Sequence, residues 1–260
     1  SVIIIAFLAV FPFIVKLVQG VLKVQMPGSD TALVQFVFLF SCLAGLITWR
    51  EDRHLSLASV TAKVTGTAGT IIAGVRTAVI TCILTSLFFD SFCQLVNPIQ
   101  FTTSFWHLSV KIFYTFLPVC YLGIIIMTAS KKKSLIPALI GIAAGIIISS
   151  GTLAGILYYV FNMENTPHLY AVNDAWNAFS HAAVWPLIIF LVISAFFGVP
   201  LFLVLGGISY ILFSQSGGYV DVIPLETYRI LTDRTIAAIP LFTIAGYILA
   251  QGSAGQRYVA

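Results

Sequence analysis

Residues 138–161 read "ALIGIAAGIIISSGTLAGILYYVF" and contain no charged side chain. A transmembrane α-helix needs about 20 consecutive, mainly apolar residues to cross a hydrocarbon core of about 30 Å. The stretch meets that requirement. Its apolar residues do not alternate with polar ones, as they would in a strand of a membrane barrel. The stretch therefore predicts a membrane-spanning helix.

The whole chain is also rich in apolar residues and poor in charged ones. It has 260 residues, of which 59% are hydrophobic and 8% are charged, and its mean hydropathy is +1.03. Soluble domains carry about 25% charged residues. We therefore expect an all-α, polytopic integral membrane protein with about seven spans. The spans are predicted at Val2–Leu22, Ala32–Trp49, Gly69–Leu95, Trp106–Ala129, Leu135–Phe161, Ala183–Phe213 and Thr235–Ala250.

Proline and glycine residues mark places where the last two spans are expected to break. Ala183–Phe213 is too long for one ordinary span, so Gly198 and Pro200 predict either one kinked helix or two pieces broken near "FFGVPLF". Pro240 lies in the next apolar run, and Gly246 follows it. Broken helices commonly lie at ion or substrate paths in transporters, so Pro200, Pro240 and Gly246 are candidates for such a break.

The basic residues predict how the chain is oriented. They follow the second and fourth predicted spans, whereas the alternate loops hold few or none. The excess of basic residues faces the cytoplasm, which places the N-terminus there. Residues 55–64, "LSLASVTAKV", are expected to form a short amphipathic connector along the membrane surface. The predicted inner-face anchors are Trp49, Arg50, Arg53, Lys131, Lys132 and Lys133.

Two segments on the opposite side differ in character. Residues 96–106 and 162–182 are polar and aromatic and hold no lysine or arginine. They are predicted to be outer loops. Each is long enough to serve as a docking face, and each is also compatible with a plain solvated connector that carries interfacial aromatic residues.

No catalytic pattern is visible in the sequence. The chain lacks a phosphate-binding GxxxxGK[ST] loop, an HExxH zinc motif and a GxSxG nucleophile turn. We therefore expect no enzymatic activity, no bound metal and no cofactor. The four cysteines lie in or beside apolar runs without CxxC spacing, which is typical of small buried hydrophobic residues. They are Cys42, Cys82, Cys93 and Cys120.

Charged residues inside predicted spans are the remaining candidates. Asp90 and Lys111 lie near the outer ends of the third and fourth spans, which a short loop joins. A structural ion pair between them is our hypothesis. The alternative is that each side chain extends to the membrane surface, as is also expected of Lys16 and Arg76.

Two parts of the sequence resemble a known family. Residues 30–59, "DTALVQFVFLFSCLAGLITWREDRHLSLAS", resemble the small membrane subunit of tripartite ATP-independent periplasmic (TRAP) transporters. Residues 198–212, "GVPLFLVLGGISYIL", and 236–257, "IAAIPLFTIAGYILAQGSAGQR", resemble the beginning of the large subunit. The order implies a fused permease, with a four-helix small-subunit scaffold (1–133), a linker helix and outer loop (134–182) and the start of the large transport subunit (183–260).

The resemblance implies a function and a location. It implies a secondary transporter of the bacterial inner membrane that is driven by a sodium gradient and takes an organic acid anion from a periplasmic substrate-binding protein. The partners are that protein, the remainder of the large subunit and the lipid bilayer; nucleic acid is not among them. In this family the large subunit moves the substrate, and the small subunit braces the static scaffold in the membrane.

No substrate-binding residue is transferred from the family to this sequence. The sodium- and substrate-binding hairpins are expected beyond Ala260, and Tyr247 stands where the family often has an acidic residue. The alternative is a structural membrane subunit that supports another complex without transporting anything. A membrane redox enzyme would require paired histidines inside the spans, and the predicted spans hold no such pair.

Overall fold

A computed structural model describes most of the middle of the chain. The described ranges are 29–51, 66–97, 104–105, 108–131, 134–163, 166–215 and 222–233, together with positions 14, 17, 18, 20, 21, 220 and 246.

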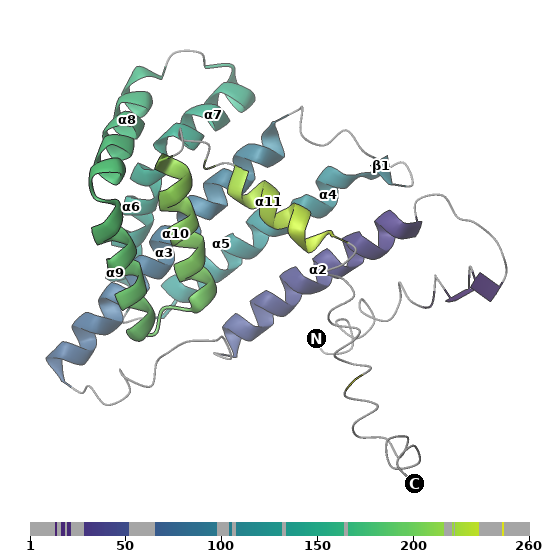
Figure 1. The fold of residues 1–260 in the computed structure, drawn as a ribbon, viewed down its shortest axis with the longest axis horizontal. Coiled ribbons are helices and arrows are strands. Elements are labelled where there is room, and N and C mark those ends of the chain that lie inside the picture. Colours follow the sequence, from purple (N-terminus) through teal and green to yellow (C-terminus); the bar gives the residue numbers. More distant parts are fainter. Residues whose placement is uncertain are drawn as a thin grey trace, which may run out of the picture.

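The described ranges are helical apart from one short β pairing, as predicted. The two strands, β1 (Ser104–Phe105) and β2 (Leu108–Ser109), pair antiparallel. The helices, shown in Figure 1, are α2 (Ser29–Arg50), α3 (Thr67–Val96), α4 (Val110–Tyr114), α5 (Phe116–Ala129), α6 (Leu135–Ile148), α7 (Ser150–Phe161), α8 (Pro167–Ala182), α9 (Val184–Phe196), α10 (Leu201–Gln215) and α11 (Val222–Leu231).

Two helices in the described ranges are long and apolar enough to cross a membrane. They are α3 and the combined α4–α5 helix, Val110–Ala129, and they agree with the third and fourth predicted spans. The number rises to four if each of two bent helix pairs forms one crossing. The first and seventh predicted spans and the connector at 55–64 lie almost wholly outside the described residues. The total of seven spans therefore stays a prediction.

The fifth predicted span is bent rather than straight, which corrects the expectation of one regular helix over Leu135–Phe161. Helices α6 and α7 meet at Ser149 and differ in direction by 70°. Ser149, Ser150 and Gly151 stand in a row there, and runs of serine and glycine are common causes of sharp kinks.

The sixth predicted span consists of two helices. Helices α9 and α10 are separated at Gly198, whose φ of +90° suits glycine, and at the buried Pro200. The break near "FFGVPLF" is therefore confirmed, and the single-helix alternative is wrong.

The predicted outer loop at 162–182 is mostly helix, which is a second correction. Pro167 begins α8, and proline is favoured in the first turn of a helix. Asn173, Asn177 and Ser180 suggest a loop by composition, but their spacing places them on one face of α8. Ser180 is fully buried, and Asn173 and Asn177 are half-buried. Because this polar face turns inward, α8 contacts α7 and α10.

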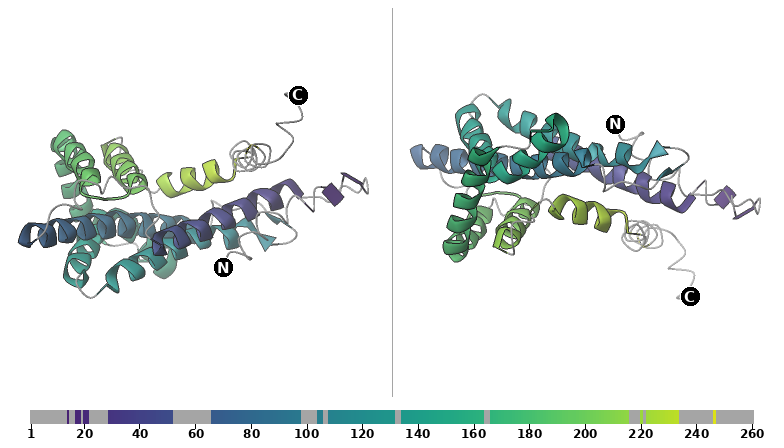
Figure 2. Two further views of the ribbon diagram at one scale, coloured as in Figure 1. Left: turned by 90° about the horizontal axis from the view of Figure 1, so that it is seen from below. Right: turned by 90° about the horizontal axis from the view of Figure 1, so that it is seen from above.

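The helices pack on both sides of α3. Figure 2 shows α2 and α3 in a middle layer, with α10 and α11 on one side and α5, α6 and α7 on the other. The larger apolar core lies around Leu84, Leu191 and Leu203 and joins α3 to α9 and α10. A smaller core around Phe38, Tyr114 and Tyr228 joins α2, α4 and α11.

Side-chain contacts fix the relative directions of the helices. Helix α2 runs parallel to α5, because Cys42 meets Cys120 and Leu46 meets Gly123. Helix α3 likewise runs parallel to α6, since Gly74 faces Pro137 near the start of both helices. The ends of α2 and α5 and the starts of α3 and α6 therefore lie at the same end of the bundle. We call it the basic end, because Arg50 and Lys131 are located there.

Candidate functional site

A row of small and polar residues runs between α3 and the α6–α7 pair. We call it the polar seam. Its members are Thr81, Thr85, Ser86 and Asp90 of α3, Gly141 and Gly145 of α6, and Thr152 of α7. The four α3 side chains and Thr152 are buried. The seam is thus the main polar feature inside an otherwise apolar bundle.

The threonine hydroxyl groups of α3 donate hydrogen bonds to nearby backbone carbonyls. Thr85 Oγ1 donates to the Thr81 carbonyl at 2.7 Å, and Thr81 Oγ1 donates to the Thr77 carbonyl at 2.9 Å. Thr81 also reaches across to the Ala138 carbonyl of α6 at 3.2 Å. Such bonds let hydroxyl groups be buried without the full cost of an unpaired polar group.

Two glycines of α6 allow the helices to approach closely. A Cβ at Gly145 would lie 2.7 Å from the Cys82 carbonyl oxygen, and one at Gly141 would overlap Thr81 Oγ1 and the Ala78 carbonyl. Ser86 Oγ lies 3.5 Å from the Gly145 carbonyl. The four-residue spacing of the glycines is typical of tightly packed membrane helices.

Asp90 is the acidic member of the seam and has no exposed surface. Its Oδ1 accepts a hydrogen bond of 2.6 Å from Thr152 Oγ1 of α7. Lys111 lies in the first turn of α4 and is half-buried. The contact recorded here for Asp90 is with Thr152, and the ion pair with Lys111 stays a prediction.

The bend between α6 and α7 adds two buried hydroxyl groups. Ser149 is 1% exposed and Ser150 is 2% exposed, and neither hydroxyl has a hydrogen-bond partner within the described part of the chain. Unpaired buried hydroxyl groups are costly. The bend therefore places two buried hydroxyl groups that lack a hydrogen bond next to the seam.

A second polar contact joins α2 to α11. Gln35 Nε2 of α2 donates to Tyr228 Oη of α11 at 2.6 Å. The Tyr228 ring packs edge to face against Phe38, with ring centroids 4.9 Å apart, and against Tyr114 at 5.3 Å. We call these four residues the α11 junction. Burial raises the pKa of Tyr228 while the Gln35 hydrogen bond opposes the rise, so the phenol is neutral near pH 7.

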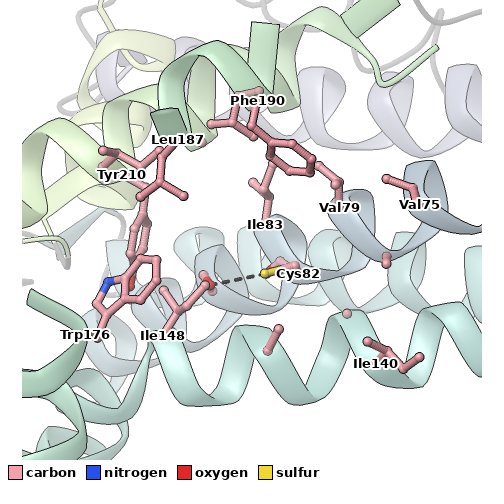
Figure 3. A pocket seen from close by; sticks show the side chains of 17 residues that line it. Val75, Val79, Cys82, Ile83, Ile140, Ile148, Trp176, Leu187, Phe190 and Tyr210 are labelled. Carbon is pink, nitrogen blue, oxygen red and sulfur yellow. Dashed lines mark hydrogen bonds between the residues drawn. The ribbon is translucent and has the colours of Figure 1, made fainter. Parts of the chain in front are cut away.

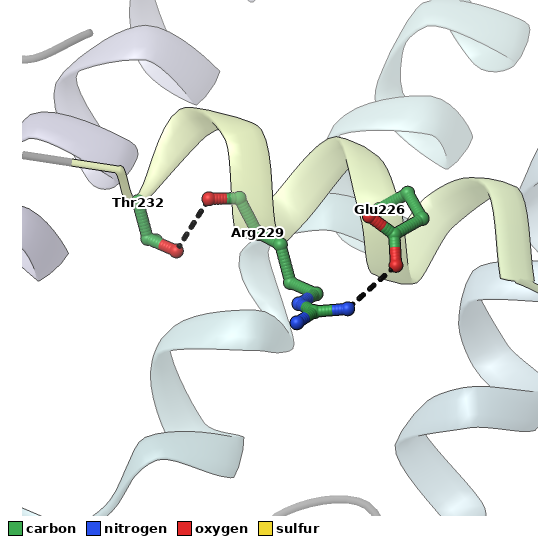
Figure 4. Close-up of polar contacts among 3 residues, drawn as sticks. All are labelled: Glu226, Arg229 and Thr232. Atoms are coloured by element: carbon green, nitrogen blue, oxygen red, sulfur yellow. Dashed lines mark hydrogen bonds and ion pairs between the residues drawn. The ribbon is translucent and has the colours of Figure 1, made fainter. Parts of the chain in front are cut away.

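The opposite face of α11 is exposed and charged. Arg229 Nη1 lies 2.8 Å from Glu226 Oε1, and Thr232 Oγ1 donates to the Arg229 carbonyl at 3.3 Å (Figure 4). Helix α11 is thus amphipathic, with Tyr228 toward the bundle and its ion pair toward the outside.

The predicted anchors are only partly described. Arg50 and Lys131 are exposed at the basic end, whereas Trp49 is buried and packs edge to face against Phe202 of α10, with centroids 6.3 Å apart. Trp49 therefore contributes to the core, and its role as an anchor stays a prediction. Arg53, Lys132, Lys133 and Pro240 lie outside the described residues, and Gly246 is described only as an exposed helical position.

The four cysteines are free, and the predicted burial is confirmed for three of them. Cys42, Cys93 and Cys120 are buried, and Cys82 is half-buried. The described residues contain no group of three or more histidine, cysteine, aspartate or glutamate side chains that could hold a metal ion.

The sequence contains a signal for the polar seam in the spacing of its small and polar residues. Thr77, Thr81 and Thr85 recur every four residues, and Gly141 and Gly145 have the same spacing. Both patterns predict a helix face that packs closely. Nothing local pointed to the contact between Gln35 and Tyr228, which are 193 residues apart.

The site offers hydroxyl groups, one carboxylate and backbone carbonyls. These groups can form hydrogen bonds that hold the helices together. No protein-family model, characterised protein or solved structure matches this chain.

Proposed function

We propose that the chain is part of the permease of a sodium-gradient-driven secondary transporter that imports an organic acid anion delivered by a binding protein. Residues 1–133 form a membrane scaffold, 134–182 connect, and 183–260 begin the transport part. The function is proposed for the complete permease in the bacterial inner membrane, with its N-terminus in the cytoplasm. The sequence resemblance supplies the substrate class and the coupling ion.

One structural observation supports the membrane setting. The described bundle buries polar side chains such as Asp90, Thr81 and Gln94, while it exposes large apolar ones such as Leu139, Trp185 and Leu205. Water favours the reverse arrangement, whereas lipid accepts apolar side chains outside and favours hydrogen-bonded polar groups inside.

The arrangement of the helices also fits a scaffold joined to a mobile part. The polar seam holds α3 to α6 through backbone-close contacts, which suits a rigid brace. Helices α9 and α10, which begin the proposed transport part, are short and separated by a break, and transporters commonly form their ion and substrate sites from broken helices. The α11 junction ties the expected start of the transport part to α2.

Uptake in proteoliposomes tests this function. The complete permease is reconstituted with its binding protein, and accumulation of labelled organic acid anions is followed with an inward sodium gradient. We expect uptake that requires both the gradient and the binding protein. Equal uptake with sodium balanced across the membrane, or without the binding protein, would contradict the proposal.

The second candidate is a structural membrane subunit that transports nothing. The self-satisfied hydroxyl groups of α3 favour it, because they indicate packing rather than ligand binding. Co-purification of the chain in a fixed ratio with an unrelated membrane complex, together with no uptake, would support this alternative.

A further inference from the structure

A cavity of about 320 Å³ lies beside α3 and is lined by residues of α3, α6, α8, α9 and α10 (Figure 3). Its wall is almost wholly apolar and includes no charged side chain. Ligand sites in proteins commonly have volumes of about 300–1,000 Å³ and apolar walls. Even an apolar cavity of about 150 Å³ stays dry and takes up apolar guests. The cavity is therefore suited to a hydrocarbon and unsuited to a carboxylate anion.

The cavity is long rather than round. Val75 and Ile140 lie at one end, and Trp176 and Tyr210 lie at the other (Figure 3). Along α3 the wall extends from Val75 to Ser86, which is about 16 Å at a rise of 1.5 Å per residue. One leaflet of a bilayer contributes about half of a hydrocarbon core of about 30 Å. The length thus matches one acyl chain of one leaflet.

The cavity opens to the outer surface of the bundle, where lipid would be in contact with it. Three residues of the wall are also exposed on the outer surface: Ile140 is 61% exposed, Phe190 47% and Val75 41%. The cavity is therefore continuous with the apolar outer surface of the bundle. Val75 belongs to the first turns of α3 and thus lies toward the basic end, where an anionic lipid headgroup is favoured.

The closed end holds an unsatisfied donor. Trp176 Nε1 is buried and has no hydrogen-bond partner within the described residues. The Ser86 hydroxyl, by contrast, is engaged with the Cys82 carbonyl at 3.2 Å. One donor does not hold a water molecule, which needs about 2–4 polar partners, so the apolar wall favours a hydrocarbon occupant.

We propose that this cavity binds one acyl chain of an anionic phospholipid. The chain enters between Val75 and Ile140 and ends near Trp176, and the headgroup stays at the basic end. This inference rests on the bilayer setting of the proposed function but not on transport. A lipid held here would fill the gap that α3 leaves toward α9 and α10.

Native mass spectrometry of the detergent-purified complete polypeptide tests the proposal. We expect one retained phospholipid per chain. Ala144 of α6 lines the cavity, whereas its neighbour Ala143 is exposed. Ala144→Phe should therefore lose the phospholipid, and the matched variant Ala143→Phe should keep it. Wild-type protein without any retained phospholipid, or equal retention by both variants, would overturn the proposal.

Two additions make the test decisive. If Ala144→Phe does not fold, Ala78→Leu fills the same cavity from α3, and exposed Ala73→Leu is its control. Delipidated protein is also offered phosphatidylglycerol or palmitate. Rebinding of palmitate instead of phosphatidylglycerol would contradict a phospholipid occupant. Because no step measures transport, loss of uptake and loss of lipid binding are separate results.

Discussion

The two sides of α3 are packed in opposite ways. Toward α6 and α7, small residues and hydroxyl groups bring backbones together, as Gly145 and Thr85 show. Toward α9 and α10, large apolar residues such as Leu84, Leu191 and Leu203 meet and leave a cavity. The closest backbone approaches lie on the polar side, whereas the cavity lies where the two sides meet, since α6 lines it together with α9 and α10. In lipid, helix contacts depend on close packing and hydrogen bonds, so the two sides should respond differently to substitution.

The largest effect is expected at the tightest point of the polar seam. Gly145→Leu should lower stability by about 3 kcal/mol, because its side chain would press on Cys82 and Thr85. Thermal melting in detergent measures this loss. Gly45→Leu in α2 is the matched control, since a Cβ there meets nothing within 4 Å and leucine favours helix. Equal melting of the two variants would mean that the seam is not close-packed.

A smaller effect is expected at the carboxylate of the seam. Thr152→Val keeps the shape of the side chain but removes the donor to Asp90 Oδ1, which should cost about 1–3 kcal/mol. Thr152→Ser should restore most of the loss in the same melting assay. If Thr152→Val melted like the wild type, the hydrogen bond would add nothing to the polar side of α3.

Lys111→Gln tests the ion pair predicted from the sequence. Loss of stability in this variant and in Asp90→Asn, with no further loss in the double variant, would support a pair between Asp90 and Lys111. Unchanged melting of both single variants would rule the pair out. The comparison with Thr152→Val then shows which contact matters more to the seam.

The sequence predicted the helices better than their arrangement. Long apolar runs were enough to predict α3 and α4–α5, and "GVP" marked Pro200 as a place of either a kink or a break. The 70° bend at Ser149 was missed, because hydropathy does not report direction. Helix α8 was missed because its inward face is polar, which reverses the pattern expected of a soluble helix.

The candidate sites were harder to predict from the sequence, because they depend on how the helices are arranged. The seam depends on which faces meet, and the Asp90 partner came from α7 rather than from the neighbouring span in the sequence. The cavity depends on the shapes of five helices, so no local pattern reports it.

The α11 junction contains a hydrogen bond on the side of α3 where apolar contacts dominate. It therefore tests how much a polar contact contributes on that side. Tyr228→Phe keeps the ring contacts with Phe38 and Tyr114 but removes the bond to Gln35 Nε2. We expect a loss of about 1 kcal/mol. A double-mutant cycle with Gln35→Leu in the melting assay isolates this bond. Strictly additive losses would mean that the two side chains do not interact.

The smallest effect is expected on the outer face of α11. Arg229→Gln removes the ion pair with Glu226. The Arg229 side chain is 69% exposed and the Glu226 side chain is 43% exposed. Exposed pairs of this kind contribute less than about 1 kcal/mol and are weakened by salt. The melting temperature should therefore change little, and the change should vanish in high salt. A loss as large as that of Tyr228→Phe would show that this face is buried against another part of the complete protein, and that α11 is held from both sides.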